Sequence, residues 1–186
     1  MTSAEKLVRL KEIVRERSFS EGEAKTLASG RTSNFYFNMK MTMSQPEGLV
    51  LIADLMLDKL AEGPCDVVGG LAMGAVPIVN AISLRSFQTG APIPLIWIRK
   101  EAKEHGTQAT IEGEDIANLA GKTAVMVEDV TTTGGSVMKA IETVRANGVT
   151  VNRVITIVDR LEGAKDALSK QGLSLTCLLN ADDFRI

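Results

Sequence analysis

Four short apolar runs recur along the chain, and they constrain the fold more than any other feature. They are DVVGGLA (66–72), IPLIWIR (93–99), TAVMVED (123–129) and RVITIVD (153–159). A glycine-containing or polar turn follows each run, and helix-like segments separate most of them. Strands that are apolar at consecutive positions are buried on both faces, which occurs in parallel sheets covered by helices. The sequence therefore predicts one α/β domain with a mainly parallel central sheet flanked by helices.

The remaining segments extend this prediction toward both ends of the chain. Apolar residues at helical spacing predict an amphipathic helix over residues 3–17, and a proline favours the start of a second helix over 46–62. NFYFNMK (34–40) alternates apolar and polar residues, with Lys40 on the polar side, and predicts a strand. SLTCLL (174–179) predicts an edge strand. Within a single domain of residues 1–186, we expect about 1–45 to form a small N-terminal subdomain.

Composition excludes several classes of protein. The net charge of −2 gives no general affinity for nucleic acid or for a membrane surface. No apolar run approaches the roughly 18 residues of a membrane-spanning helix, and the N-terminal MTSAEKLVRL lacks the apolar core of a signal peptide. We therefore expect a cytoplasmic protein that binds neither nucleic acid nor membrane. Any anion that it binds must be held by a local site.

The third apolar run continues into VMVEDVTTTGGSV (125–137), where two adjacent carboxylates precede a turn rich in threonine and glycine. A helix is predicted to begin near Gly134. Ligands of open α/β sheets bind beyond the carboxyl ends of the strands, which is where this turn lies. Its glycines allow backbone N–H groups to approach a ligand, and a helix N-terminus favours an anion. The segment therefore predicts a phosphate cradle.

This cradle differs from the common nucleotide-binding turns. No lysine follows Gly135, as a P-loop requires, and the G-x-G-x-x-G pattern of a dinucleotide fold is absent. Two carboxylates would repel a polyphosphate, but they suit the paired hydroxyls of a ribose. The alternative is a strand-end aspartate that only caps the next helix. The whole constellation favours a ribose 5′-phosphate, with its hydroxyls on Glu128 and Asp129 and its phosphate on the turn.

VMVEDVTTTGGSV resembles the signature with which type I phosphoribosyltransferases bind 5-phosphoribosyl pyrophosphate (PRPP). Three further segments narrow the resemblance to the orotate phosphoribosyltransferase family: LASGRTSNFYFN (27–38), RKEAKEHG (99–106) and VDRLEG (158–163). The resemblance implies the type I phosphoribosyltransferase fold, with residues 1–45 as an N-terminal hood. It also implies transfer of the 5-phosphoribosyl group from PRPP to orotate in pyrimidine biosynthesis, giving orotidine 5′-phosphate and pyrophosphate.

The resemblance also assigns roles to individual residues. The catalytic residues implied are Lys103, Asp129 and His105. Orotate would be bound by Tyr36, Phe37, Thr132 and Arg160. PRPP would be bound by Arg99, Lys100, Lys103, His105, Glu128, Asp129, Val130, Thr131, Thr132, Thr133, Gly134, Gly135 and Ser136. From the residues alone, Tyr36 and Phe37 could equally be packing residues, and Arg160 a solvated strand end.

Residues 99–115 are polar and contain two glycines, which predicts a mobile loop, and by resemblance it is the catalytic loop. His105 is the only histidine and has no partner at ligand spacing, so we expect no metal ligand from protein side chains. By resemblance Mg²⁺ is the cofactor and arrives with PRPP, and backbone N–H groups of GGLAMGAVP (69–77) bind pyrophosphate. The resemblance further implies a homodimer whose catalytic loop reaches the neighbouring site.

The sequence departs from the family at two positions. Ala28 and Gly74 stand where several relatives carry ligand-contacting lysines, and Lys40 is a candidate replacement. Two alternatives stay open. One is a purine phosphoribosyltransferase, against which RKEAKEHG and Arg160 argue. The other is a PRPP-binding regulator without catalysis, which would be expected to lose the loop lysine that this chain retains as Lys103.

Overall fold

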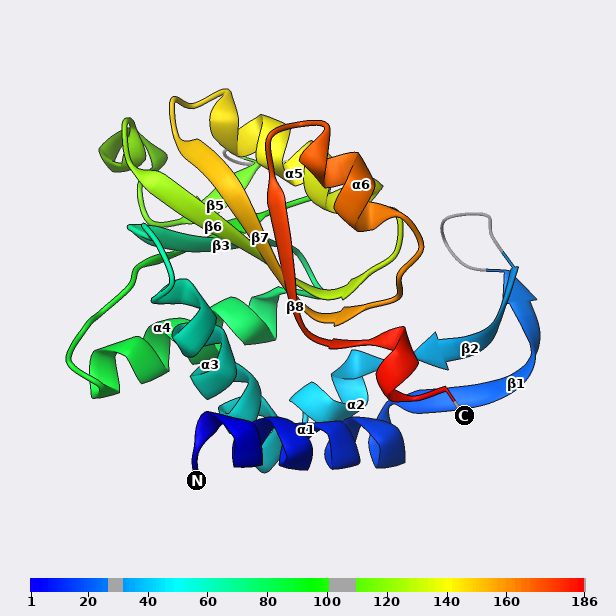
Figure 1. Cartoon of the computed structure of the whole chain (residues 1–186). Coiled ribbons are helices and arrows are strands. Elements are labelled where there is room, and N and C mark those ends of the chain that lie inside the picture. Colours follow the sequence, from blue (N-terminus) through cyan, green and yellow to red (C-terminus); the bar gives the residue numbers. More distant parts are fainter. Residues whose placement is uncertain (27–31, 101–109, 186) are drawn as a thin grey trace, which may run out of the picture.

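A six-stranded sheet forms the centre of the described structure, and helices cover both of its faces (Figure 1). The computed structural model describes residues 1–26, 32–100 and 110–185. The strand order is β5-β4-β3-β6-β7-β8, and only the β4–β5 pair is antiparallel. The strands are β3 (Val67–Leu71), β4 (Leu95–Ile98), β5 (Ile111–Gly113), β6 (Thr123–Thr131), β7 (Thr150–Asp159) and β8 (Ser174–Asn180). The predicted mainly parallel sheet and its edge strand β8 are confirmed.

The helices divide between the two faces of the sheet and enclose a separate core on each. The α-helices are α1 (Ser3–Arg17), α2 (Met39–Met43), α3 (Pro46–Leu60), α4 (Val76–Gln88), α5 (Gly135–Arg145) and α6 (Ala164–Ser169), and short 3₁₀ helices span Ile116–Leu119 and Ala181–Asp183. One core contains α3 and α4, with α1 outside α3; the other contains α5 and α6. Along β6, Val125 faces the first core and Met126 the second. Burial on both faces explains why the strand sequences are apolar at consecutive positions.

The N-terminal region contains α1, α2 and an antiparallel hairpin of β1 (Phe19–Thr26) and β2 (Thr32–Phe37). The strand predicted over 34–40 ends earlier than expected, because Met39 and Lys40 already belong to α2. The turn into that helix is fixed from outside the segment: Ser18 accepts hydrogen bonds from the backbone of Asn38 and, through its hydroxyl, from that of Thr42. Lys40 therefore projects from a helix rather than from the polar face of a strand.

The described part of the segment predicted as a loop over 99–115 contains a short strand. Ile111–Gly113 form β5, which pairs with β4 along the edge of the sheet. Three residues carry too little periodicity to reveal a strand, and only the exposed edge of β4 provides its partner. Residues 101–109 lie outside the described residues, so the predicted mobility of this loop stays a prediction.

The order of the strands determines where a ligand can bind. β3 connects through α4 to β4 on one side, whereas its neighbour β6 connects through α5 to β7 on the other. Because α4 and α5 cover opposite faces, the chain diverges at the carboxyl ends of β3 and β6. Such a divergence opens a crevice that open α/β folds use for ligands.

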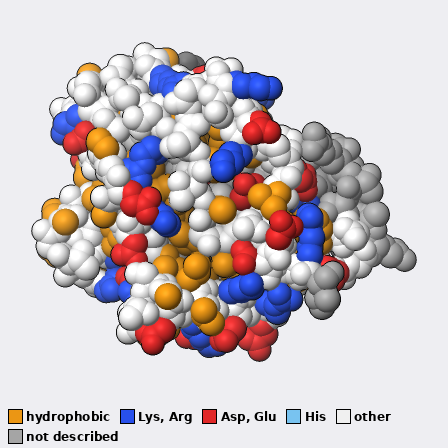
Figure 2. Space-filling view, in the orientation of Figure 1, with side chains coloured by type: hydrophobic (Ala, Val, Ile, Leu, Met, Phe, Trp, Pro, Cys, Tyr) orange, Lys and Arg blue, Asp and Glu red, His pale blue; other side chains and the backbone are white. Residues whose placement is uncertain are grey.

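The surface is mixed in charge, and Figure 2 shows Lys, Arg, Asp and Glu side chains interspersed over the face in view. No single-sign patch of the kind that attracts nucleic acid is visible on that face. None of the helices in the described ranges is long and apolar enough to cross a membrane.

A substitution of Gly70 in β3 tests how closely the chain packs beside the crevice. A Cβ at this position would lie 2.3 Å from Ala75 Cβ and 3.1 Å from the carbonyl oxygen of Val127. We expect Gly70→Ala to lower the unfolding free energy by about 1–3 kcal/mol through overpacking, and to lower Tm by at least roughly 2 °C. Thermal unfolding checks this. Gly22→Ala is the control, because nothing lies within 4 Å of its added Cβ; equal Tm values for the two variants would contradict the close contact.

Candidate active site

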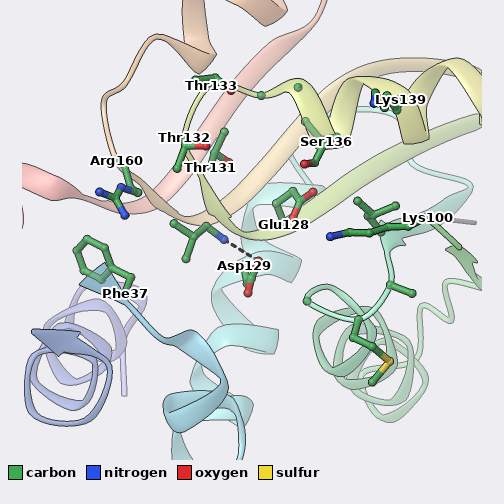
Figure 3. Close-up of a pocket in the computed structure, with 18 of the residues that line it drawn as sticks. Phe37, Lys100, Glu128, Asp129, Thr131, Thr132, Thr133, Ser136, Lys139 and Arg160 are labelled. Carbon is green, nitrogen blue, oxygen red and sulfur yellow. Dashed lines mark hydrogen bonds between the residues drawn. The ribbon is translucent and has the colours of Figure 1, made fainter. Parts of the chain in front are cut away.

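A cavity of about 880 Å³ occupies the crevice between the ends of β3 and β6 (Figure 3). Residues from five separated parts of the sequence line it. They are Tyr36, Phe37, Lys40, Leu71, Ala72, Met73, Gly74, Lys100, Glu128, Asp129, Val130, Thr131, Thr132, Thr133, Gly134, Gly135, Ser136, Val137, Lys139 and Arg160. The described residues that were predicted to bind a ligand all lie in this set, with the exception of Arg99.

The turn between β6 and α5 forms one wall of the cavity. Gly134 has φ 82° and precedes the first residue of α5, a left-handed conformation that favours glycine. The first turn of a helix leaves its backbone N–H groups without partners inside the helix, and they carry partial positive charge. Thr132, Thr133 and Ser136 add hydroxyl groups on the same wall. The wall can therefore bind a phosphate without any cationic side chain.

Two carboxylates lie beside this wall, at the end of β6. Burial, followed by the charge of Asp129, raises the pKa of Glu128 to about 8, although the charge of Lys100 opposes the shift. Burial also raises the pKa of Asp129, while the Val130 N–H, 2.9 Å from Asp129 Oδ1, and the charge of Lys40 oppose that. Carboxyl groups that are removed from water lose hydrogen bonds, and hydroxyl groups of a ligand can replace them.

Cationic side chains surround the carboxylates. Lys40 from α2, Lys100 after β4 and Lys139 from α5 all line the cavity, and Figure 3 places Lys100 and Lys139 at one end of it. Gly74 belongs to the turn after β3, where a Cβ would lie 2.8 Å from Asp129 Oδ1. A side chain at position 74 would therefore displace this carboxylate, which gives a physical reason for the glycine there.

Aromatic side chains and an arginine form the opposite end of the cavity. Phe37 is buried, whereas the Tyr36 ring is 47% exposed at the rim. Arg160 follows β7 and is only 2% exposed, so the reading of a solvated strand end is wrong. Its Nε donates to Glu162 Oε1 at 2.8 Å, and its backbone N–H donates to Thr131 O, which joins it to the cradle. Figure 3 shows Arg160 and Phe37 together, on the far side of the carboxylates from Lys100.

One described residue of the sequence prediction falls outside the cavity, and three residues that it named are not described. Arg99 forms an ion pair with Glu112 of β5, with Nε 3.0 Å from Oε1, and is not among the described lining residues. Lys103 and His105 lie outside the described residues, as does Ala28. Their predicted roles stay predictions.

The structure adds one cation that sequence reasoning missed. Lys139 lines the cavity one helical turn after Ser136. Residues three apart on a helix share a face, so the spacing from Ser136 was a signal that could have identified it. Within the segment 69–77, which was predicted to bind pyrophosphate, Leu71 to Gly74 line the cavity, and the binding role stays a prediction.

Comparison with known proteins agrees with this fold and site. A family model described as phosphoribosyl transferase domain matches residues 41–180, which include the cradle and both carboxylates. The chain is therefore a phosphoribosyltransferase by class.

Relatives over the full length define the family within this class. The orotate phosphoribosyltransferase of Bradyrhizobium sp. (strain ORS 278) is 51% identical over 185 residues, covering 99% of this chain and 100% of that one. The crystal structure of the Mycobacterium tuberculosis H37Rv enzyme of the same name superposes with a TM-score of 0.82 at 35% identity, over 97% of this chain and 99% of that chain. A complex of the latter protein with PRPP superposes with a TM-score of 0.77 at 29% identity, over 97% and 92% of the two chains. This chain belongs to the orotate phosphoribosyltransferase family.

The buried Glu128 predicts a pH-dependent stability. A carboxyl pKa raised from 4.5 to about 8 means that the folded protein holds a proton that the unfolded chain releases. This contribution to stability is present at low pH and is lost as the pH rises through that interval. Glu128→Gln removes the titration, so its Tm advantage over the parent should be larger near about pH 8.5 than near about pH 5.

Thermal unfolding across this pH range measures the difference between the two proteins. The exposed carboxylate of Glu142 provides the matched control, since Glu142→Gln should change Tm by a similar amount at both pH values. A Glu128→Gln difference that does not vary with pH would contradict the burial of a charge-bearing carboxyl.

Proposed function

We infer that this protein transfers the 5-phosphoribosyl group of PRPP to N1 of orotate, releasing pyrophosphate and forming orotidine 5′-phosphate in pyrimidine biosynthesis. One observation carries the inference. The cavity combines a carboxylate pair, a phosphate cradle and an aromatic–arginine end in a chain that is about half identical to orotate phosphoribosyltransferases over its full length.

The order of groups along the cavity matches the order of groups in the substrates. The 5′-phosphate fits the wall from Thr131 to Ser136, and the ribose hydroxyls fit Glu128 and Asp129. The base then lies toward Tyr36, Phe37, Thr132 and Arg160, and the pyrophosphate toward Lys100 and the turn after β3. We assign to Lys40 the positive charge that relatives carry at positions 28 and 74, and Lys139 adds a further charge at the pyrophosphate end.

Positioning and electrostatics supply the catalysis, and no covalent intermediate is required. As the bond from C1 to pyrophosphate breaks, the ribose gains oxocarbenium character, and N1 of orotate forms the new bond with inversion. Asp129 is placed to stabilise the positive sugar. Lys100, together with Lys103 and His105 of the catalytic loop, stabilises the charge on the leaving group. A closed loop would exclude water from the activated ribose.

Mg²⁺ suits the oxygen-rich surroundings of this site. Magnesium prefers oxygen ligands and keeps several waters, so Glu128 and Asp129 fit it through such waters while PRPP supplies the direct ligands. When bound with PRPP it adds positive charge at the departing pyrophosphate.

We further propose a cytoplasmic homodimer in which the loop of one protomer completes the site of the other, with residues 1–45 as a hood over the base. Exposed apolar side chains support a partner copy. Met73, which lines the cavity, is 70% exposed, and Leu84 and Phe87 toward the C-terminal end of α4 are 61% and 73% exposed. Large exposed apolar side chains favour burial in an interface.

The base specificity is tested by supplying PRPP and Mg²⁺ with orotate, uracil, adenine or hypoxanthine and following consumption of each base. We expect rapid consumption of orotate alone, because only orotate carries a carboxylate for the arginine end of the cavity. Asp129→Asn is the site control and should lower turnover at least about tenfold, or roughly 1.4 kcal/mol, while remaining folded. Preferred use of a purine, or full activity of that variant, would contradict the proposal.

Sharing of the catalytic loop is tested by subunit mixing. Lys103→Ala and Asp129→Asn chains should each be nearly inactive, but mixed chains should regain part of the activity. Some heterodimers then contain one site with an intact loop and an intact carboxylate. Subunit exchange is verified with differently tagged chains. Exchanged heterodimers that stay inactive would show that each protomer uses its own loop.

A further inference from the structure

We propose that Phe35 and the C-terminal residues Phe184 and Arg185 are positioning residues for base recognition, because they hold Arg160 and Phe37 in place without lining the cavity. The inference rests on the proposed function and deepens it. It states that specificity for the base depends on residues from both ends of the chain, which hold the base-binding side chains in place. Figure 1 shows the C-terminus beside the β1–β2 hairpin.

Arg160 contacts Phe35 in two ways. Its Nη2 donates to the carbonyl oxygen of Phe35 at 3.3 Å, and its guanidinium carbon lies 4.4 Å from the centre of the Phe35 ring. A guanidinium that is 2% exposed has lost most of its hydration, and an aromatic face partly replaces it through the ring quadrupole. The flat ring also fixes the plane of the guanidinium. A planar, fixed donor is what the recognition of a carboxylate requires.

The Phe35 ring is in turn supported by the C-terminus. The guanidinium carbon of Arg185 lies 4.5 Å from the same ring centre. Phe35 also packs edge-on against Phe37, with ring centres 5.8 Å apart, and Phe184 packs against Phe37 at 5.1 Å. Phe35 therefore contacts both cavity-lining residues, Arg160 and Phe37, and Phe184 contacts Phe37.

The C-terminal segment is held in turn by α1. Phe184 is fully buried, and Arg15 donates to the carbonyl oxygens of Phe184 and Asp183 at 3.2 and 2.8 Å. Lys11 forms an ion pair with Asp183 at 3.1 Å. These contacts fix the last residues against the N-terminal region. The base end of the cavity thus depends on residues from both ends of the sequence.

A double-mutant cycle on the full chain tests whether Phe35 acts through Arg160. Arg160→Ala should raise the Michaelis constant for orotate by roughly tenfold to a hundredfold. Phe35→Leu keeps an apolar side chain but removes the ring face, and should raise that constant about threefold to tenfold. The constant for PRPP should change less than about twofold in both. In the Arg160→Ala background, Phe35→Leu should raise the orotate constant by a clearly smaller factor, because only its contact with Phe37 then remains.

Two more variants separate positioning from loss of stability. Arg185 is exposed, so Arg185→Gln should leave the fold intact and still raise the orotate constant, about twofold to fivefold. If Phe35→Leu fails to fold, the Arg185→Gln variant still tests the positioning role. Leu173→Ala lies in the core on the other face of the sheet and is the control. It should lower Tm at least as much as the Phe35 variant while leaving the orotate constant unchanged.

The outcomes distinguish this proposal from the proposed function. Suppose that Arg160→Ala is impaired for orotate, but that Phe35→Leu and Arg185→Gln have the same Michaelis constant for orotate as the parent. This result would overturn the positioning role alone. Fully additive effects in the cycle would do the same. A parent protein that does not consume orotate would instead overturn the proposed function, and the positioning role with it.

Discussion

The divergence of the chain at the ends of β3 and β6 is the constraint on which the rest of the structure depends. These neighbouring strands lead into helices on opposite faces of the sheet, and that arrangement alone leaves a crevice between two packed layers. The carboxylates at the end of β6, the N-terminus of α5 and the turn after β3 all meet there because each follows one of these two strands. A ligand can then be surrounded without any cavity inside a core.

The carboxyl groups at this crevice lower the stability of the folded protein. Glu128 and Asp129 are adjacent and largely removed from water, and the cost appears as the raised pKa of each. Lys40 of α2 and Lys100 after β4 offset part of that cost, although they are far apart in sequence. Gly74 keeps the space beside Asp129 open. Hydroxyl groups of the proposed phosphorylated sugar would replace the hydrogen bonds that these carboxyl groups have lost to water.

The two ends of the cavity differ in their chemistry. One end has backbone N–H groups and lysines, which can bind anions from many directions. The other has a buried arginine that contacts the Phe35 ring and pairs with Glu162. Under the proposed function, this second end would recognise a planar, carboxylate-bearing base, which needs a directional donor. The rigid support comes from the hairpin and the C-terminal segment, which pack as one aromatic group.

The sequence alone identified the strands of the sheet other than β5 and the helix after the cradle, because apolar periodicity is a local property. It also identified Glu128, Asp129 and the Thr131–Ser136 wall, which belong to one contiguous motif. It did not determine the start of α2, which Ser18 fixes from outside, or β5, which needs the edge of β4 as its partner. The burial of Arg160, the entry of Lys139 into the site and the Phe35 contacts with Arg160 and Arg185 were also decided only by the tertiary structure. Those features arise where segments that are distant along the chain come into contact, and a local sequence pattern does not predict such contacts.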